Sequence, residues 1–154
     1  MKTIRDLLGE HQLFRSFHPD LLELMAGCGH NVHFEAGKQI FSEGEPADEF
    51  YVLRSGKVSI GIAVPHRGTV LVETLGPNEV LGVSWPFPPY RWEFDSRAMD
   101  PTSAIAMDAE CLRTKCEEDP ALGYQVFKSF ALLMRNRLQA TRLQLLDLYG
   151  NHAG

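Results

Sequence analysis

The chain has 154 residues, enough for one domain with a hydrophobic core and too few for two ordinary domains. Its 20 acidic and 15 basic side chains give a formal net charge of -5, which provides no broad attraction to the phosphates of nucleic acids. No apolar run approaches the roughly 20 residues that cross a bilayer, and the N-terminus lacks the cleavage site of a secretory signal. We therefore expect a cytoplasmic protein that contacts neither nucleic acid nor membrane directly.

The first 30 residues are expected to form two short helices. Apolar side chains recur at near-helical spacing before and after Pro19, and Gly27 and Gly29 are expected to end the second helix. Residues 31–108 then change to an alternating pattern, in which short apolar runs are separated by turns at glycine and proline. Several short strands at close intervals predict an antiparallel sandwich or barrel.

Residues 109–150 are expected to be helical. One long helix is predicted after Pro120, and Gly150 is expected to end it. The apolar side chains of this helix recur at three- and four-residue steps, so they must pack against the strands or against a second copy of the helix. This stripe consists of Phe127, Phe130, Met134, Leu138, Thr141, Leu145 and Leu148. The polar face carries Lys128, Arg135, Arg137 and Arg142.

The three cysteines, Cys28, Cys111 and Cys116, form an odd set without a CxxC pair. This spacing disfavours both a disulfide framework and a four-ligand zinc site. We therefore expect reduced, partly buried thiols.

The β-strand region resembles the cyclic-nucleotide-binding domain found in bacterial catabolite regulators, kinase regulatory subunits and gated channels. The matching positions are turn glycines and alternating apolar residues in the segment GKQIFSEGEPADEFYVLRSGKVSI, which begins at Gly37, and in LGPNEVLG, which ends at Gly82. With the flanking helices, the resemblance covers nearly the whole chain. It implies an α+β fold over residues 1–154, with a jelly-roll-like antiparallel β-barrel (a double-stranded β-helix), N-terminal helices and a long C-terminal helix. It also implies a non-enzymatic regulatory or sensor role. Regulators of this type continue into a DNA-reading helix-turn-helix, which is absent before Gly154, so we expect action through another protein or as a subunit.

In that family a glycine and the following amides cradle the phosphate of cyclic AMP or cyclic GMP, a glutamate binds the ribose, and an arginine pairs with the phosphate. The resemblance places the cradle glycine at Gly82, but puts Val83 at the glutamate position and Trp92 at the arginine position. Arg91, one residue away, could turn inward, and Ser84 could supply a polar contact. Gly82, Val83, Ser84, Arg91 and Trp92 are therefore the candidate ligand-binding residues. Arg97 is expected to be structural, pairing with Asp95 or Glu93.

Two interpretations of this segment remain open. In the first, a sensor module binds a cyclic nucleotide or a non-standard small ligand near Gly82 and repositions the C-terminal helix, through which it forms a homodimer. In the second, Trp85, Tyr90 and Trp92 fill the pocket, and the domain serves only for protein interaction and dimerisation.

A third interpretation, a metal-dependent cupin enzyme, needs an HxH pair inside the barrel. His30 and His33 are three residues apart and would point to opposite faces of a strand, so we predict neither a metal site nor catalytic residues.

Overall fold

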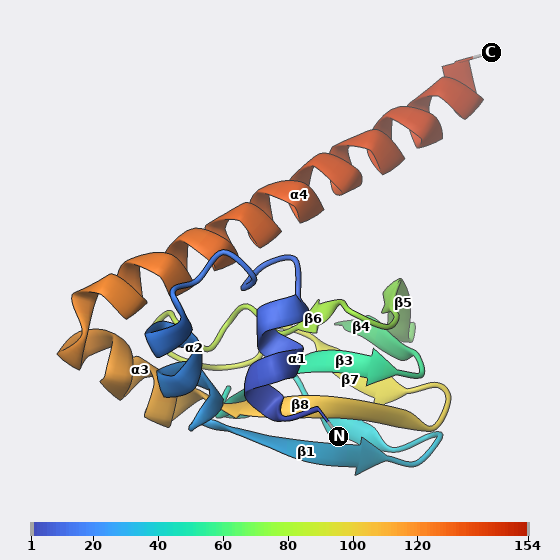
Figure 1. Ribbon diagram of the computed structural model, residues 1–154. Coiled ribbons are helices and arrows are strands. Elements are labelled where there is room, and N and C mark those ends of the chain that lie inside the picture. Colours follow the sequence, from blue (N-terminus) through green and yellow to red (C-terminus); the bar gives the residue numbers. More distant parts are fainter. Residues whose placement is uncertain (1, 154) are drawn as a thin grey trace.

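A computed structural model describes residues 2–153 and places two antiparallel sheets against each other, with helices at one end (Figure 1). The first sheet has the strand order β1-β8-β3-β6, formed by β1 (Gly29–Phe34), β8 (Thr102–Asp108), β3 (Glu49–Ser55) and β6 (Val80–Leu81). The second has the order β2-β7-β4-β5, formed by β2 (Gln39–Phe41), β7 (Asp95–Ala98), β4 (Val58–Val64) and β5 (Gly68–Leu75). The α+β fold class is confirmed, although each named strand pairs within its own sheet, so the roll is not a closed barrel.

Glycine fixes the corners at which the chain passes from one strand to the next. Gly56, between β3 and β4, has φ +90°, and a Cβ there would collide with the backbone of Pro101 and Thr102. β3 and β8 are covered on both faces: four consecutive residues of each strand, 50–53 and 104–107, are buried although successive side chains point to opposite faces of the sheet.

The N-terminal region contains α1 (Ile4–Glu10) and α2 (Pro19–Ala26). Thr3 begins α1 with a capping box: its hydroxyl accepts from the Asp6 amide, and the Asp6 carboxylate accepts from the Thr3 amide. Pro19 occupies the first turn of α2, where its missing N–H costs nothing. Leu8 and Met25 are buried, so both helices pack on the core.

The C-terminal region contains α3 (Ala109–Glu118) and α4 (Pro120–Ala153). Asp119 caps α4, since its carboxylate accepts from the amides of Ala121 and Leu122. The first turns of α4 bury Leu122 and Phe130, and the rest of the helix extends past the sheets (Figure 1). The prediction that Gly150 ends this helix is wrong, because α4 continues through it to Ala153. A glycine inside a helix lowers its stability without stopping it.

The prediction for the cysteines is also wrong in part. Cys28 and Cys111 form a disulfide, with 5.7 Å between their Cα atoms, and Cys116 is the free, buried thiol. The pairing arises from strand register: β1 lies antiparallel to β8, with Gly29 opposite Met107. The residue before β1 therefore lies beside the first turn of α3, although the two cysteines are 83 positions apart. The spacing of the two cysteines in the sequence does not indicate that they lie close together.

Candidate functional site

The segment from Gly82 to Trp92, here called the cassette, connects β6 to the strand β7 of the other sheet. Its end is fixed by backbone hydrogen bonds to the turn after β2. Trp92 N–H donates to the Glu45 carbonyl at 2.9 Å, and Gly44 N–H donates to the Trp92 carbonyl at 2.8 Å. Ala47 N–H donates to the Tyr90 carbonyl at 2.7 Å. These bonds determine which side chains of the cassette face inward.

Trp92 fills the space in front of the cradle glycine. Gly82 has φ +110°, a conformation that favours glycine, and a Cβ built on it would lie 2.6 Å from Cη2 of Trp92. The indole is 4% exposed and stacks on Phe41, with ring centroids 3.8 Å apart. An indole therefore occupies the position beside Gly82 where the family resemblance places an arginine.

Val83 and Ser84, the next two candidate residues, are half-buried. The Val83 side chain packs against the hydrophobic core and has no hydrogen-bonding group. The carbonyl of Ser84 accepts from Phe87 N–H at 3.3 Å, which forms a turn. A ligand-binding role for either residue stays a prediction.

Arg91 lies on the surface, and its Nη1 donates to the Gly44 carbonyl at 2.8 Å. Arg97 is held by two acceptors, the Gly37 carbonyl at 2.7 Å and Oε1 of Gln39 at 2.8 Å. The expected acidic partners of Arg97 are therefore wrong, because β7 pairs with β2 and brings Gln39 opposite Arg97.

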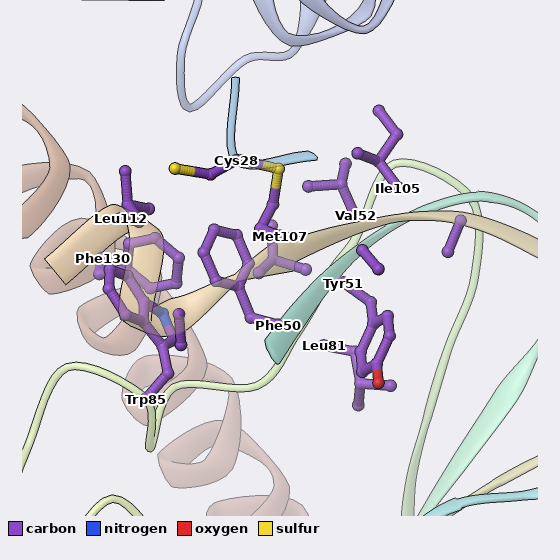
Figure 2. Packing of buried hydrophobic residues seen from close by; sticks show 14 of the residues in the cluster. Cys28, Phe50, Tyr51, Val52, Leu81, Trp85, Ile105, Met107, Leu112 and Phe130 are labelled. Atoms are coloured by element: carbon purple, nitrogen blue, oxygen red, sulfur yellow. The ribbon is translucent and has the colours of Figure 1, made fainter. Parts of the chain in front are cut away.

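Trp85 connects the cassette to α4. Its indole is fully buried, stacks on Phe50 of β3, and meets Phe130 of α4 edge to face at a centroid distance of 5.2 Å (Figure 2). Arg113 of α3 donates from Nη1 to the Trp85 carbonyl at 2.7 Å. A displacement of this part of the cassette would therefore act directly on α3 and α4.

A polar hollow of about 250 Å³ lies between α4, the β5–β6 turn and the loop after α1. Arg137 borders it and donates from Nη2 to the Val80 carbonyl, so it is not part of the solvated face on which the sequence places it. Burial lowers the pKa of Arg137, while the nearby Glu73 and Glu79 act in the opposite direction. The sequence places Arg137 on the polar face of α4 but does not show that it is half-buried, because no motif distinguishes it from the other basic residues of that face.

The histidines considered for a cupin site lie on β1, both exposed. His30 Nε2 is 3.7 Å from Oε2 of Glu49, and His33 Nδ1 is 3.4 Å from the Ser103 hydroxyl. Burial raises the pKa of Glu49, with His30 partly offsetting it. Within residues 2–153 the structure contains no group of three or more His, Cys, Asp or Glu side chains arranged to hold a metal ion. No helix in that range is both long and apolar enough to span a membrane.

A comparison against known protein families agrees with the arrangement of the strands and the long helix. Residues 31–119, more than half of the chain, match the family model described as the cyclic nucleotide-binding domain. The chain belongs to this family.

Individual relatives of this cyclic-nucleotide-binding domain are distant. The CRP-like cAMP-activated global transcriptional regulator of Mycobacterium tuberculosis is 28% identical over 143 residues, which cover 93% of this chain and 62% of the relative. The chain thus spans about 62% of the length of that curated relative.

Two solved structures share the fold. A cyclic nucleotide-binding domain from Methylobacillus flagellatus KT has a TM-score of 0.79 at 18% identity, over 93% of this chain and 80% of that one. The catabolite activator protein of Thermus thermophilus has a TM-score of 0.68 at 23% identity, over 89% and 62%. At these identities the likeness shows the fold alone.

Proposed function

We propose that this cyclic-nucleotide-binding domain is a non-enzymatic regulatory domain whose nucleotide position is filled by its own aromatic side chains. It would act by presenting α4 to a second copy of the chain. The observation that carries the proposal is the indole of Trp92, buried against Gly82 and stacked on Phe41. A phosphate at this glycine would have to displace a side chain that contributes a large buried apolar area.

The chemistry of the neighbouring positions supports the same interpretation. Val83 provides no acceptor for a ribose hydroxyl, and Arg91, the nearest guanidinium in sequence, donates to the Gly44 carbonyl on the surface. A cyclic nucleotide in the cassette would therefore find neither a carboxylate for its ribose nor an inward cation for its phosphate, the two groups that the family resemblance associates with nucleotide binding.

The exposed part of α4 supports self-association. From Met134 onward the stripe advances by alternating steps of four and three residues, through Leu138, Thr141, Leu145 and Leu148. This is the heptad spacing that keeps one apolar seam facing a partner helix. Leu138, Leu145 and Leu148 are 51%, 49% and 54% exposed, so among residues 2–153 no other segment buries this seam. A parallel or antiparallel partner helix of identical sequence supplies a matching seam.

Titration calorimetry with cyclic AMP and cyclic GMP tests the filled cassette. The expected result is no saturable heat at millimolar nucleotide. Saturable binding with one nucleotide per chain would contradict the proposal. The same titration on Trp92→Ala serves as a comparison, because removing the indole opens the space in front of Gly82.

A second candidate is a ligand sensor, and the contact between Trp85 and Phe130 favours it. That contact connects the cassette directly to α4, as a sensor that transmits ligand binding to its helix requires. Saturable heat accompanied by a change in Trp85 fluorescence would support this candidate, and a silent titration would remove it for the two nucleotides tested.

A further inference from the structure

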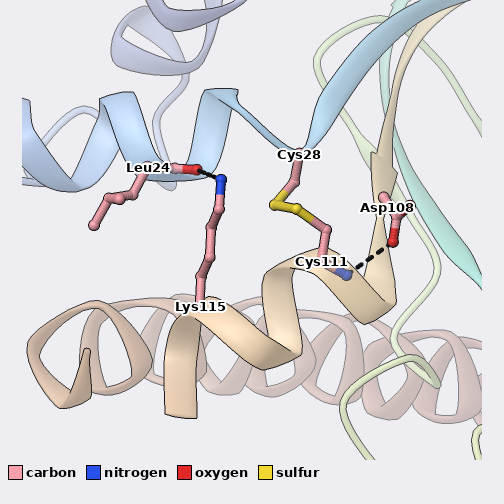
Figure 3. Close-up of a disulfide and its surroundings, with 5 residues drawn as sticks. All are labelled: Leu24, Cys28, Asp108, Cys111 and Lys115. Carbon is pink, nitrogen blue, oxygen red and sulfur yellow. Dashed lines mark hydrogen bonds between the residues drawn. A yellow bond between two sulfur atoms is a disulfide. The ribbon is translucent and has the colours of Figure 1, made fainter. Parts of the chain in front are cut away.

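The disulfide lies at the junction between the N-terminal helices and the C-terminal pair (Figure 3). Cys28 follows α2 directly, and Cys111 belongs to the first turn of α3, where its amide donates to the side chain of Asp108 at 2.9 Å. The backbone is already paired here, since the Asp108 amide donates to the Cys28 carbonyl at 2.8 Å beside the Gly29–Met107 pair, and the disulfide adds a covalent link. The bond crosslinks α2 to α3 through a covalent bridge over 83 positions of the sequence.

Two hydrogen bonds reinforce the same junction without the sulfurs. Lys115 Nζ, one turn after Cys111, donates to the Leu24 carbonyl of α2 at 2.9 Å (Figure 3). The Ser129 hydroxyl of α4 donates to the Leu13 carbonyl, in the loop between α1 and α2, at 3.0 Å. The N-terminal helices are thus attached to both C-terminal helices, and the disulfide is the covalent part of that attachment.

The two sulfurs differ in their access to solvent. Cys28 is 4% exposed, whereas Cys111 is half-buried and borders an open hollow of about 350 Å³. Thr114, Lys115 and the acidic residues Asp108, Glu110 and Glu118 also line this hollow. A small thiolate could enter there and reach the Cys111 sulfur, with the ammonium of Lys115 close by, while the rest of the domain stays folded.

We propose that Cys28–Cys111 is a reversible thiol–disulfide site, opened by a small dithiol that attacks from the hollow beside Cys111. The thiolate of the reductant bonds to Sγ of Cys111, and Cys28 leaves as a thiolate that takes a proton from water. The second thiol of the reductant then attacks the reductant's first sulfur, which is bonded to Sγ of Cys111 in the mixed disulfide, and releases Cys111. The protein disulfide gains two electrons and two protons, and the dithiol becomes a disulfide.

Opening the bond changes how the N-terminal helices are held. With both thiols reduced, α2 is held by its buried Leu22 and Met25, by the backbone hydrogen bond between Asp108 and Cys28, and by the hydrogen bonds of Lys115 and Ser129. The loss of the covalent link gives the end of α2 more freedom to move relative to α3. Reduced Cys28 stays in the core as a small apolar side chain. A disulfide in a reducing compartment is usually transient or redox-sensing, so the site fits the cytoplasmic location predicted from the sequence. The inference does not depend on the filled cassette or on pairing of α4.

The test begins with the full chain oxidised and folded. It is treated with dithiothreitol under native conditions, alkylated with iodoacetamide and analysed by peptide mass spectrometry. We expect Cys111, the more exposed of the two, to be alkylated only after reduction, and Cys28 to be detected as a free thiol by a second label added in denaturant. Cys116 provides an internal control: it is buried, and burial raises its pKa to about 11, so it should stay unmodified until the protein unfolds. Free Cys28 and Cys111 before reduction would overturn the proposal, as would a bond that opens only in denaturant.

The structural consequence is measured by hydrogen exchange and thermal unfolding of the oxidised and reduced chain. Reduction should raise exchange in α2 and lower Tm by roughly 5–15 °C, while the Cys116→Ser variant responds like the parent. The Cys28→Ser/Cys111→Ser variant should not respond to the reductant. Equal exchange in α2 for the two redox states of the parent would contradict the role of the bond in holding this helix.

Discussion

The indole of Trp92 lies almost parallel to the ring of Phe41, with 6° between the ring planes and 3.8 Å between the centroids. Phe41 is the last residue of β2, and Trp92 is paired through its backbone to the turn that follows that strand. The stack therefore packs the end of the cassette against β2, and the indole covers Gly82.

Trp92→Ala should lower the free energy of unfolding by about 3–5 kcal/mol, because it removes a buried aromatic side chain and leaves a cavity. Urea unfolding measures this loss. Added indole should restore part of it by binding in the vacated space. The neighbouring Arg91→Ala is the matched control: its side chain is exposed, so a change within about 0.5 kcal/mol is expected. Equal effects of the two substitutions would show that the indole does not fill the cassette.

Gly82→Ala should destabilise the fold by about 2–4 kcal/mol. Two causes combine here: φ of +110° is unfavourable for alanine, and the new Cβ would approach the Trp92 ring to 2.6 Å. Thermal or urea unfolding gives the value. Gly150→Ala is the control, because a Cβ there meets nothing within 4 Å and lies in a helix, so stability should rise by at most about 1 kcal/mol. A neutral Gly82→Ala would argue against the tight approach of the indole.

His11 should make stability fall as the pH decreases from about 6.5. Its ring is 7% exposed: Nδ1 accepts from Leu13 N–H at 3.1 Å, which places the proton on Nε2, and Nε2 donates to the Asn78 carbonyl at 2.6 Å. Burial lowers the pKa of His11, with the Asn78 contact opposing this shift. A pKa lowered by folding means that the unfolded chain binds the proton first, so stability present above pH 6.5 is lost below it.

The measurement is urea unfolding at pH 7 and pH 5. The wild-type chain should lose more free energy of unfolding over this interval than His11→Gln, which has no group to protonate there. His66→Gln, which replaces an exposed histidine in the turn between β4 and β5, is the control. An unchanged pH dependence in His11→Gln would rule out this origin of acid sensitivity.

Leu145→Ser should weaken self-association of the chain by about tenfold or more, because it places a hydroxyl in the seam proposed for α4. Sedimentation equilibrium measures the dissociation constant. Leu143→Ser is matched in chemistry and exposure: Leu143 is 62% exposed on the same helix but lies outside the heptad positions, so its effect should be small. A monomeric wild-type chain, or equal weakening by both substitutions, would contradict pairing through this seam.

The two parts of α4 show what helical periodicity predicts and what it does not. A single stripe from Phe127 to Leu148 was evident in the sequence, but the structure divides it: Phe130 is 1% exposed and packs on Trp85, while Leu138 is 51% exposed. Periodicity identifies which side chains share a face of a helix. It does not specify where along the helix the rest of the domain ends.

The sequence by itself determined the fold class and the family, because turn glycines, alternating strands and a long apolar-striped helix are local signals that recur at fixed spacing. The tertiary structure decided the side-chain placements in the cassette. Its prolines interrupt any regular period, and a shift of one residue would exchange the inward Trp92 with the outward Arg91. It likewise decided the pairing of Cys28 with Cys111, because the register of β1 on β8 brings together positions that no local pattern relates.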